Sequence, residues 1–106
     1  MSRSRITRRD LESVATLLNQ MTDNPEAPYR KEGERFVANV GNYHISGAYG
    51  GFALHQMAND GGGIRDVLRS GHVPARDLYE RMHAYRYGLE SGEVSRVRDS
   101  RPLRCA

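Results

Sequence analysis

The middle of the chain alternates short runs of strand-forming residues with clusters of glycine, and this pattern most limits the folds that the chain can adopt. Three runs are rich in aromatic and β-branched residues: 36–40, 42–46 and 52–58. Glycine-rich turns follow the second and third runs, at 47–51 and 59–63. Short runs joined by tight turns are typical of hairpins. We therefore expect an antiparallel β-meander.

This meander should contain three or four strands. Gly41 divides the first two runs, and a glycine inside a strand often marks a bulge, so 36–46 is either one bent strand or two. Residues 64–68 are expected to form an edge strand, with a short helix as the alternative. The segment 25–34, which contains two prolines, is expected to be a loop.

Two amphipathic helices are predicted to flank the strands. Residues 7–22 carry one apolar stripe at helical spacing, formed by Leu11, Val14, Ala15, Leu18 and Met21. Thr7 and Asp10 approximate a capping box, in which side chains bind the free amides of the first turn. Residues 75–88 carry a second stripe, formed by Leu78, Met82, Tyr85 and Leu89. The preceding Pro74 and the closing Gly88 suit the two ends of a helix.

The order helix, strands, helix predicts an α+β fold in which both helices pack on one face of the sheet and leave the other face open. A chain of 106 residues is long enough for one domain. We divide it into a basic N-terminal arm over 1–6, a single domain over 7–90 and a basic tail over 91–106 that is expected to be disordered. A homodimer is an ordinary way for so small a domain to cover leftover apolar surface, and Tyr87 is a candidate contact.

Charge is distributed unevenly along the chain. Four arginines and no acidic residue lie in 1–9, and four arginines against two acidic residues lie in 91–106, whereas 10–90 is slightly acidic. Binding to nucleic acid would therefore depend on the tails, whose alternative role is to confer solubility. The single cysteine, Cys105, allows no intrachain disulfide, and no apolar run is long enough for a membrane span. These features predict a cytoplasmic protein.

The turn at Tyr49 and Gly50 predicts the register of the central hairpin. If the hairpin is symmetric about these two residues, Ile45 lies opposite Leu54 on the apolar side of the sheet. His44 then lies opposite His55 on the other side, which also carries Ser46. A slip by one residue would exchange the two sides.

The facing histidines allow three functional interpretations: a pair of metal ligands, an acid–base pair, or a phosphate-binding couple when protonated. As a zinc site the pair lacks a third ligand at a diagnostic spacing, so we predict no metal and no cofactor. The alternative is two solvent-facing histidines without a site. His72 and His83 are expected to be structural or exposed.

Tyr49 at the tip of a glycine-rich loop could stack on a base or enter a pocket of a partner, or its ring could fold back onto the sheet. The glycines 61–63 are expected to form a plain turn, although their amides could also meet an anion. The predicted binding residues are His44, Ser46, Tyr49, His55, Arg65 and Arg76.

The predicted element order resembles that of the double-stranded-RNA-binding fold. That family contacts RNA through a lysine cluster at the start of its last helix. In this chain Arg76 and Asp77 stand there, and the only lysine is Lys31. The resemblance therefore covers topology and not the binding motif.

Three strings, GNYHISGAYGG at 41–51, NDGGG at 59–63 and LYERM at 78–82, resemble a group of short phage and prophage proteins that has no established activity. The resemblance covers about residues 7–90. It implies a setting in which small accessory proteins often act by binding a host enzyme, a CRISPR effector or a defence signal molecule.

We therefore favour a non-enzymatic, phage-type binding protein that inhibits a host defence system, with a host protein or defence complex as its partner. Nucleic-acid binding through the arginine-rich tails is the first alternative. The second is a small enzyme that binds a nucleotide or a metal at His44 and His55.

Overall fold

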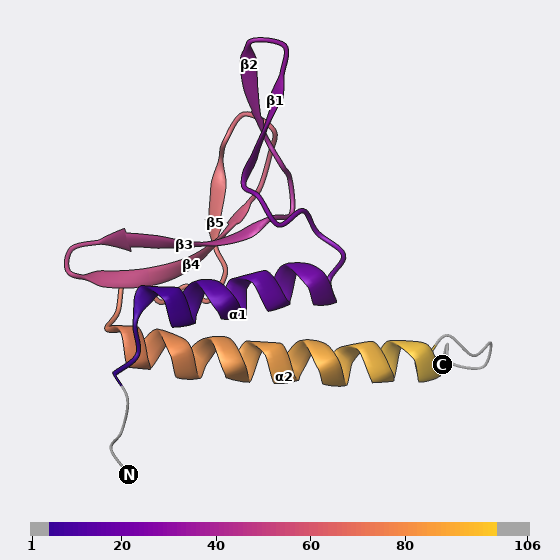
Figure 1. Cartoon of the computed structure of the whole chain (residues 1–106). Coiled ribbons are helices and arrows are strands. Elements are labelled where there is room, and N and C mark those ends of the chain that lie inside the picture. The colour runs from indigo at the N-terminus through magenta and orange to yellow at the C-terminus, as the bar shows by residue number, and fades with distance from the viewer. Residues whose placement is uncertain (1–4, 100–106) are drawn as a thin grey trace.

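The computed structural model describes residues 5–99, with side chains through residue 92 (Figure 1). It has the predicted α+β class, with a helix at each end and antiparallel strands between them. The elements are α1 (Arg8–Met21), β1 (Tyr29–Glu32), β2 (Arg35–Ala38), β3 (Tyr43–Ala48), β4 (Gly51–Met57), β5 (Ile64–Asp66) and α2 (Ala75–Asp99). None of the helices in the described part is long and apolar enough to cross a lipid bilayer.

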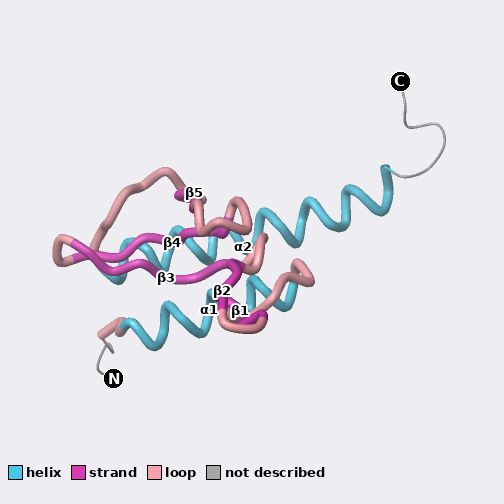
Figure 2. The backbone as a smooth tube through the Cα atoms, turned by 90° about the horizontal axis from the view of Figure 1, so that it is seen from above, coloured by secondary structure: helices cyan, strands magenta, loops and turns pink. Residues whose placement is uncertain are grey.

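The strands form two separate sheets. β3, β4 and β5 make a three-stranded antiparallel sheet in that order, and β1 pairs only with β2. Both helices lie on the same side of the three-stranded sheet, as predicted (Figure 1). α1 packs against β3 and α2 packs against β4, while the C-terminal end of α2 extends beyond the sheet (Figure 2).

The core lies between these two helices and the sheet. Four of the five residues of the predicted stripe of α1 are buried, and the fifth, Met21, is half-buried. Leu78 and Met82 of α2 are fully buried in the same core as Leu54 of β4. The predicted capping box is present: Asp10 accepts a hydrogen bond from the Thr7 amide (2.8 Å), and the Thr7 hydroxyl accepts one from the Asp10 amide (3.3 Å). Two local signals, a cap and a stripe, therefore define where α1 begins and which side it buries.

The loop predicted over 25–34 is wrong, because the structure forms the hairpin β1–β2 there. Its turn is Gly33 and Glu34, and Gly33 has the positive φ (64°) that tight hairpin turns require. β1 is exposed along its whole length, so it lacks the alternation of apolar and polar residues that normally indicates a strand. The structure also decides the question at Gly41: β2 and β3 are two strands in different sheets.

The predicted end of the last helix at Gly88 is also wrong. α2 continues through Gly88 to Asp99, so residues 91–99 of the predicted tail belong to this helix. A glycine inside a helix costs only about 1 kcal/mol relative to alanine, and the ion pair between Arg86 and Glu90 (3.0 Å) spans it. The predicted disorder of 100–106 and the residues 1–4 of the basic arm lie outside the described residues.

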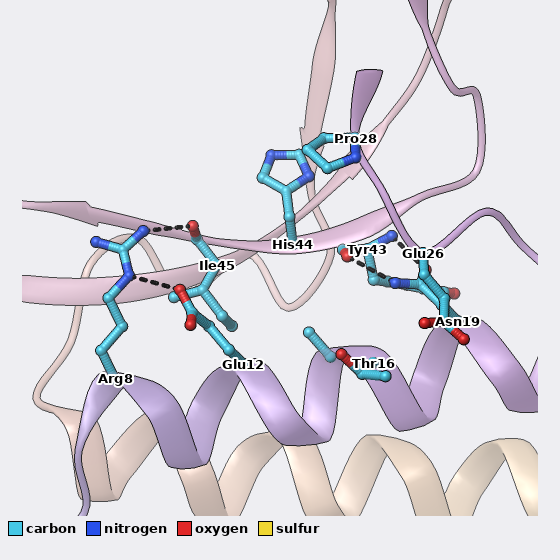
Figure 3. A pocket seen from close by; sticks show the side chains of 10 residues that line it. Arg8, Glu12, Thr16, Asn19, Glu26, Pro28, Tyr43, His44 and Ile45 are labelled. Atoms are coloured by element: carbon cyan, nitrogen blue, oxygen red, sulfur yellow. Dashed lines mark hydrogen bonds and ion pairs between the residues drawn. The ribbon is translucent and has the colours of Figure 1, made fainter. Parts of the chain in front are cut away.

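Side chains of α1 cover the free edge of β3 (Figure 3). Asn19 occupies the place of a neighbouring strand, since its Nδ2 donates to the Tyr43 carbonyl (3.0 Å) and its Oδ1 accepts from the Tyr43 amide (2.7 Å). Further along the strand, Arg8 donates to the Ile45 carbonyl (3.2 Å). An uncovered edge can pair with another chain, so these contacts protect the sheet while they attach α1 to it.

Candidate binding surface of the sheet

The central hairpin has the predicted register. Tyr49 and Gly50 form its two-residue turn, and both have positive φ (54° and 75°), as in the turn type that matches the twist of a hairpin. His44 therefore lies opposite His55, and Ile45 lies opposite Leu54. Because Ile45 and Leu54 belong to the core under the helices, the histidines lie on the opposite face of the sheet.

Four rings contact one another edge to face across this outer face, and we call them the ring row: His44, His55, His72 and Tyr49. The ring centroids are 6.0 Å apart between His44 and His55, 5.9 Å between His55 and His72, and 5.7 Å between His72 and Tyr49. The structure therefore joins three predicted binding residues to His72, which we expected to be merely structural or exposed. The fourth predicted residue of this face, Ser46, hydrogen-bonds to His72 (3.0 Å).

A contact between distant parts of the chain places His72 in the ring row. Val73 pairs with Phe52 through two backbone hydrogen bonds of 2.8 and 2.9 Å, which adds a short bridge beside β4. Side chains alternate between faces along an extended segment, so the preceding His72 points to the outer face. Gly51 makes this approach possible, because a Cβ at that position would lie 2.8 Å from the Val73 carbonyl oxygen.

Hydrogen bonds orient the ring at the start of the row. His44 Nδ1 lies 3.0 Å from Asn42 Oδ1, and the side-chain nitrogen of Asn42, Nδ2, already donates to the Pro25 carbonyl (2.8 Å). The Asn42 oxygen is therefore the acceptor, and His44 carries a proton on Nδ1. This arrangement leaves Nε2 as the acceptor nitrogen of a neutral His44.

The first two imidazoles are uncharged at neutral pH. Burial lowers the pKa of His44, and the neighbouring His55 lowers it further. Burial also lowers the pKa of His55, although the carboxylate of Asp66 opposes this shift. Neutral rings do not attract phosphate by charge, so the structure disfavours the interpretation of the pair as a phosphate-binding couple at pH 7.

Asp66 completes the polar border of the ring row on β5. The register places it beside His55, and its Oδ2 accepts a hydrogen bond from the Gly71 amide (2.9 Å). Its other oxygen, Oδ1, is buried and has no hydrogen-bond partner among the described residues. No local pattern in the sequence indicates this placement, because it depends on the pairing of β5 with β4.

The two predicted arginines do not join the ring row. Arg65 pairs with Gln56, which in turn faces Tyr43, so its position in the register is on the helix side of the sheet. Its guanidinium donates to the Gln56 side chain. Arg76 lies in the first turn of α2, in the helix layer. His83 also lies on α2, where it contacts the ring of Tyr79 at 4.6 Å.

Within residues 5–92, no group of three or more histidine, cysteine, aspartate or glutamate side chains is placed to hold a metal ion. Comparisons with protein-family models, with curated proteins and with solved structures found no match to this chain.

Proposed function

We propose that the protein is a small non-enzymatic binding protein that contacts a partner protein through the ring row. The observation that carries the proposal is the conformation and exposure of Tyr49. Tyr49 as a whole residue is 95% exposed, although its backbone is held in the left-handed region with a φ of 54°. Its ring therefore does not fold back onto the sheet.

Tyrosine is an unfavourable residue at this position of the turn. Left-handed backbone costs a residue with a Cβ about 1–2 kcal/mol, and asparagine or glycine normally occupies the site. The bulky, solvent-exposed ring of Tyr49 gives little back to the fold. A residue that weakens its own hairpin while it presents an aromatic ring to solvent is typical of a contact site.

The chemistry of the ring row fits a protein partner better than a nucleic acid. The pKa values of His44 and His55 are lowered, so their rings offer neutral edges and hydrogen-bonding nitrogens. Tyrosine anchors, neutral polar groups and shape are the usual means of protein recognition. A nucleic-acid surface would need cations near the rings, and the two predicted arginines lie elsewhere.

The resemblance to short phage and prophage proteins supplies the proposed setting. The partner would then be a host protein in the bacterial cytoplasm, and a component of a host defence system is the first to test. Inhibition would follow if the ring row occupies a surface that the defence protein needs. This identification rests on the resemblance alone, whereas the binding surface rests on Tyr49.

The substitution Tyr49→Asn separates binding from folding. Asparagine tolerates left-handed backbone, so the variant should be more stable than the parent protein by up to about 1 kcal/mol. It should nevertheless lose the partner, because the exposed ring is gone. Thermal unfolding and a quantitative pull-down from host lysate measure the two effects, and His55→Ala should weaken the same interaction.

Tyr87→Ser is the matched control, since Tyr87 is an exposed tyrosine on α2 outside the ring row. It should leave the partner bound. If a triple alanine variant at His44, Tyr49 and His55 retains every partner of the parent protein, the surface is wrongly assigned. If the parent protein retains nucleic acid and truncation of both tails abolishes this retention, the first alternative is favoured instead.

A further inference from the structure

The hairpin β1–β2, which we call the arm, has no packing partner that explains its exposed side chains. Its tip stands away from the helices (Figure 1), whereas Val37 and Ala38 near its base are buried, and each of its two strands pairs only with the other. All four residues of β1 and the first two of β2 are exposed. An isolated two-stranded hairpin is marginally stable in water, so an arm of this kind gains from being covered.

The base of the arm is firmly attached to the domain. Asn39 accepts a hydrogen bond from Arg30 Nη1 (2.7 Å) and donates one to the Ala27 carbonyl (2.9 Å). The Ala38 amide donates to the Asp60 carbonyl (3.3 Å). These contacts fix the direction of the arm in advance, so that docking it would cost little ordering entropy.

One face of the arm carries two exposed aromatic rings and a cation. The register places Tyr29, Lys31 and Phe36 on the same side. Phe36 is 71% exposed and Tyr29 is 48% exposed. Lys31 Nζ lies 6.0 Å from the centroid of the Phe36 ring. An exposed ring with an adjacent ammonium group fits an apolar pocket with carboxylates at its rim.

The same chain provides such a pocket between α1 and the edge of β3 (Figure 3). Its volume is about 330 Å3, which is more than one phenyl ring needs. Ala15 and Ile45 contribute apolar lining. The charged lining is two carboxylates, Glu12 and Glu26, and one cation, Arg8, which pairs with Glu12 (3.0 Å), so the groove keeps a net negative charge. Thr16 is an exposed lining residue of α1. We call this pocket the groove.

We propose that the groove binds the arm of a second copy of this chain, so that two copies form a symmetric dimer by exchanging arms. Phe36 of each copy enters the groove of the other, and Lys31 approaches the partner groove's carboxylates. Pro28 lines the groove and directly precedes the arm, so each groove lies at the base of its own arm. A two-fold axis across the arms therefore places each tip beside the base of the other arm, and the two contacts are identical.

The ring row remains accessible in this dimer. Of its four members, only His44 lines the groove. The dimer and the proposed function therefore share only His44, and neither Tyr49 nor His55 lines the groove. A dimer held by two rings and one cation per copy has a small interface, and we expect a Kd in about the micromolar range.

Sedimentation velocity over a concentration series of the full chain tests the dimer. The parent protein should change from monomer to dimer between about 1 and 200 µM, as the expected Kd requires. Phe36→Ser removes the inserted ring, and Thr16→Arg fills the groove with a cation, so each variant alone should be monomeric. Both changes are at exposed side chains, and circular dichroism should show unchanged folding. Tyr87→Ser, at an exposed aromatic residue on α2, should leave the dimer intact.

A mixing experiment identifies the contact. An equimolar mixture of the Phe36→Ser and Thr16→Arg variants keeps one intact arm and one intact groove per pair, so it should form a weaker dimer that neither variant forms alone. Charge reversal gives a second signature. Lys31→Glu should weaken the dimer, and the added changes Glu12→Lys and Glu26→Lys should restore part of the affinity.

Three results would overturn the proposal. The first is a parent protein that stays monomeric over the whole concentration range. The second is a dimer that survives Phe36→Ser. The third is a dimer that Phe36→Ser abolishes but Thr16→Arg does not, because the arms would then contact each other and not the grooves. Capture of a different protein by a monomer through Phe36 would likewise assign the arm to another partner.

Discussion

Replacement of Asn19 by alanine should destabilise the protein more than any other single polar substitution on α1. Asn19 is only 1% exposed, and its side chain makes two hydrogen bonds to the backbone of Tyr43. Alanine removes both bonds and leaves the Tyr43 amide and carbonyl without a partner. The substitution therefore also detaches the first residue of β3 from α1.

The expected loss can be estimated from these two bonds. A buried backbone group that loses its partner costs about 1–3 kcal/mol. Two such groups would cost about 2–6 kcal/mol, and water entering from the adjacent groove should reduce the loss to about 3 kcal/mol. This is a large fraction of the roughly 5–15 kcal/mol that stabilises a typical domain.

Urea denaturation followed by circular dichroism measures the loss. With an m-value of about 2 kcal/mol/M, the midpoint should fall by about 1.5 M while the m-value stays unchanged. Gln20→Ala is the matched control, because Gln20 is the next residue on α1 and binds only the exposed Glu26 side chain. The control should change the free energy of unfolding by less than about 0.5 kcal/mol.

Asn19→Asp adds a signature that depends on pH. An ionised carboxylate can accept from the Tyr43 amide but repels the Tyr43 carbonyl, whereas a protonated one can donate to that carbonyl. The variant should therefore lose more stability at pH 7 than at pH 4, relative to Asn19→Ala at the same pH. Equal losses for Asn19→Ala and Gln20→Ala, or an aspartate variant without this pH dependence, would refute the role assigned to Asn19.

Three further outcomes follow from the structure. The free energy of unfolding should fall as the pH drops below about 6.5, because the lowered pKa values of His44 and His55 let the unfolded state take up protons first. A variant with glutamine at both positions should show a flatter profile of the urea midpoint between pH 7 and 5, and an equally steep profile would contradict this cause. Gly51→Ala should break the pairing with Val73 and lower the free energy of unfolding by about 2 kcal/mol, since the added Cβ would overlap the Val73 backbone. A decrease of less than about 0.5 kcal/mol, measured by urea denaturation, would contradict this close approach. Gly88→Ala should raise the free energy of unfolding by about 0.5–1 kcal/mol, because nothing lies near its Cβ position and α2 continues through it. Unchanged or reduced thermal stability would argue against a continuous helix at this residue.

The parts of the fold that were predicted correctly depend on residues close together in the chain. The cap formed by Thr7 and Asp10 and the stripe of α1 act within one or two helical turns. The hairpin register needs only the turn at Tyr49 and the alternation on either side of it. These local signals were sufficient to place His44 and His55 on the open face of the sheet.

The errors arose where local signals were absent or were overridden. β1 shows no apolar alternation, because both of its faces are exposed, and the two prolines before it predicted a loop through residue 34. Gly88 would suit the end of a helix, but the ion pair between Arg86 and Glu90 accompanies the continuation of α2. For Arg65 no local signal indicated a face of the sheet, and its pairing with Gln56 places it on the face opposite the histidines.

Patterns along the chain were sufficient to predict the two helices, the central hairpin and the face that carries the paired histidines. The position of His72 beside them could be seen only in the folded chain, because it depends on the pairing of Val73 with Phe52 across 21 positions of the sequence. The same holds for Asn19, which completes the edge of β3, 24 residues away. Such contacts depend on how whole elements pack, and side-chain spacing along one segment carries no information about the segment that will lie beside it.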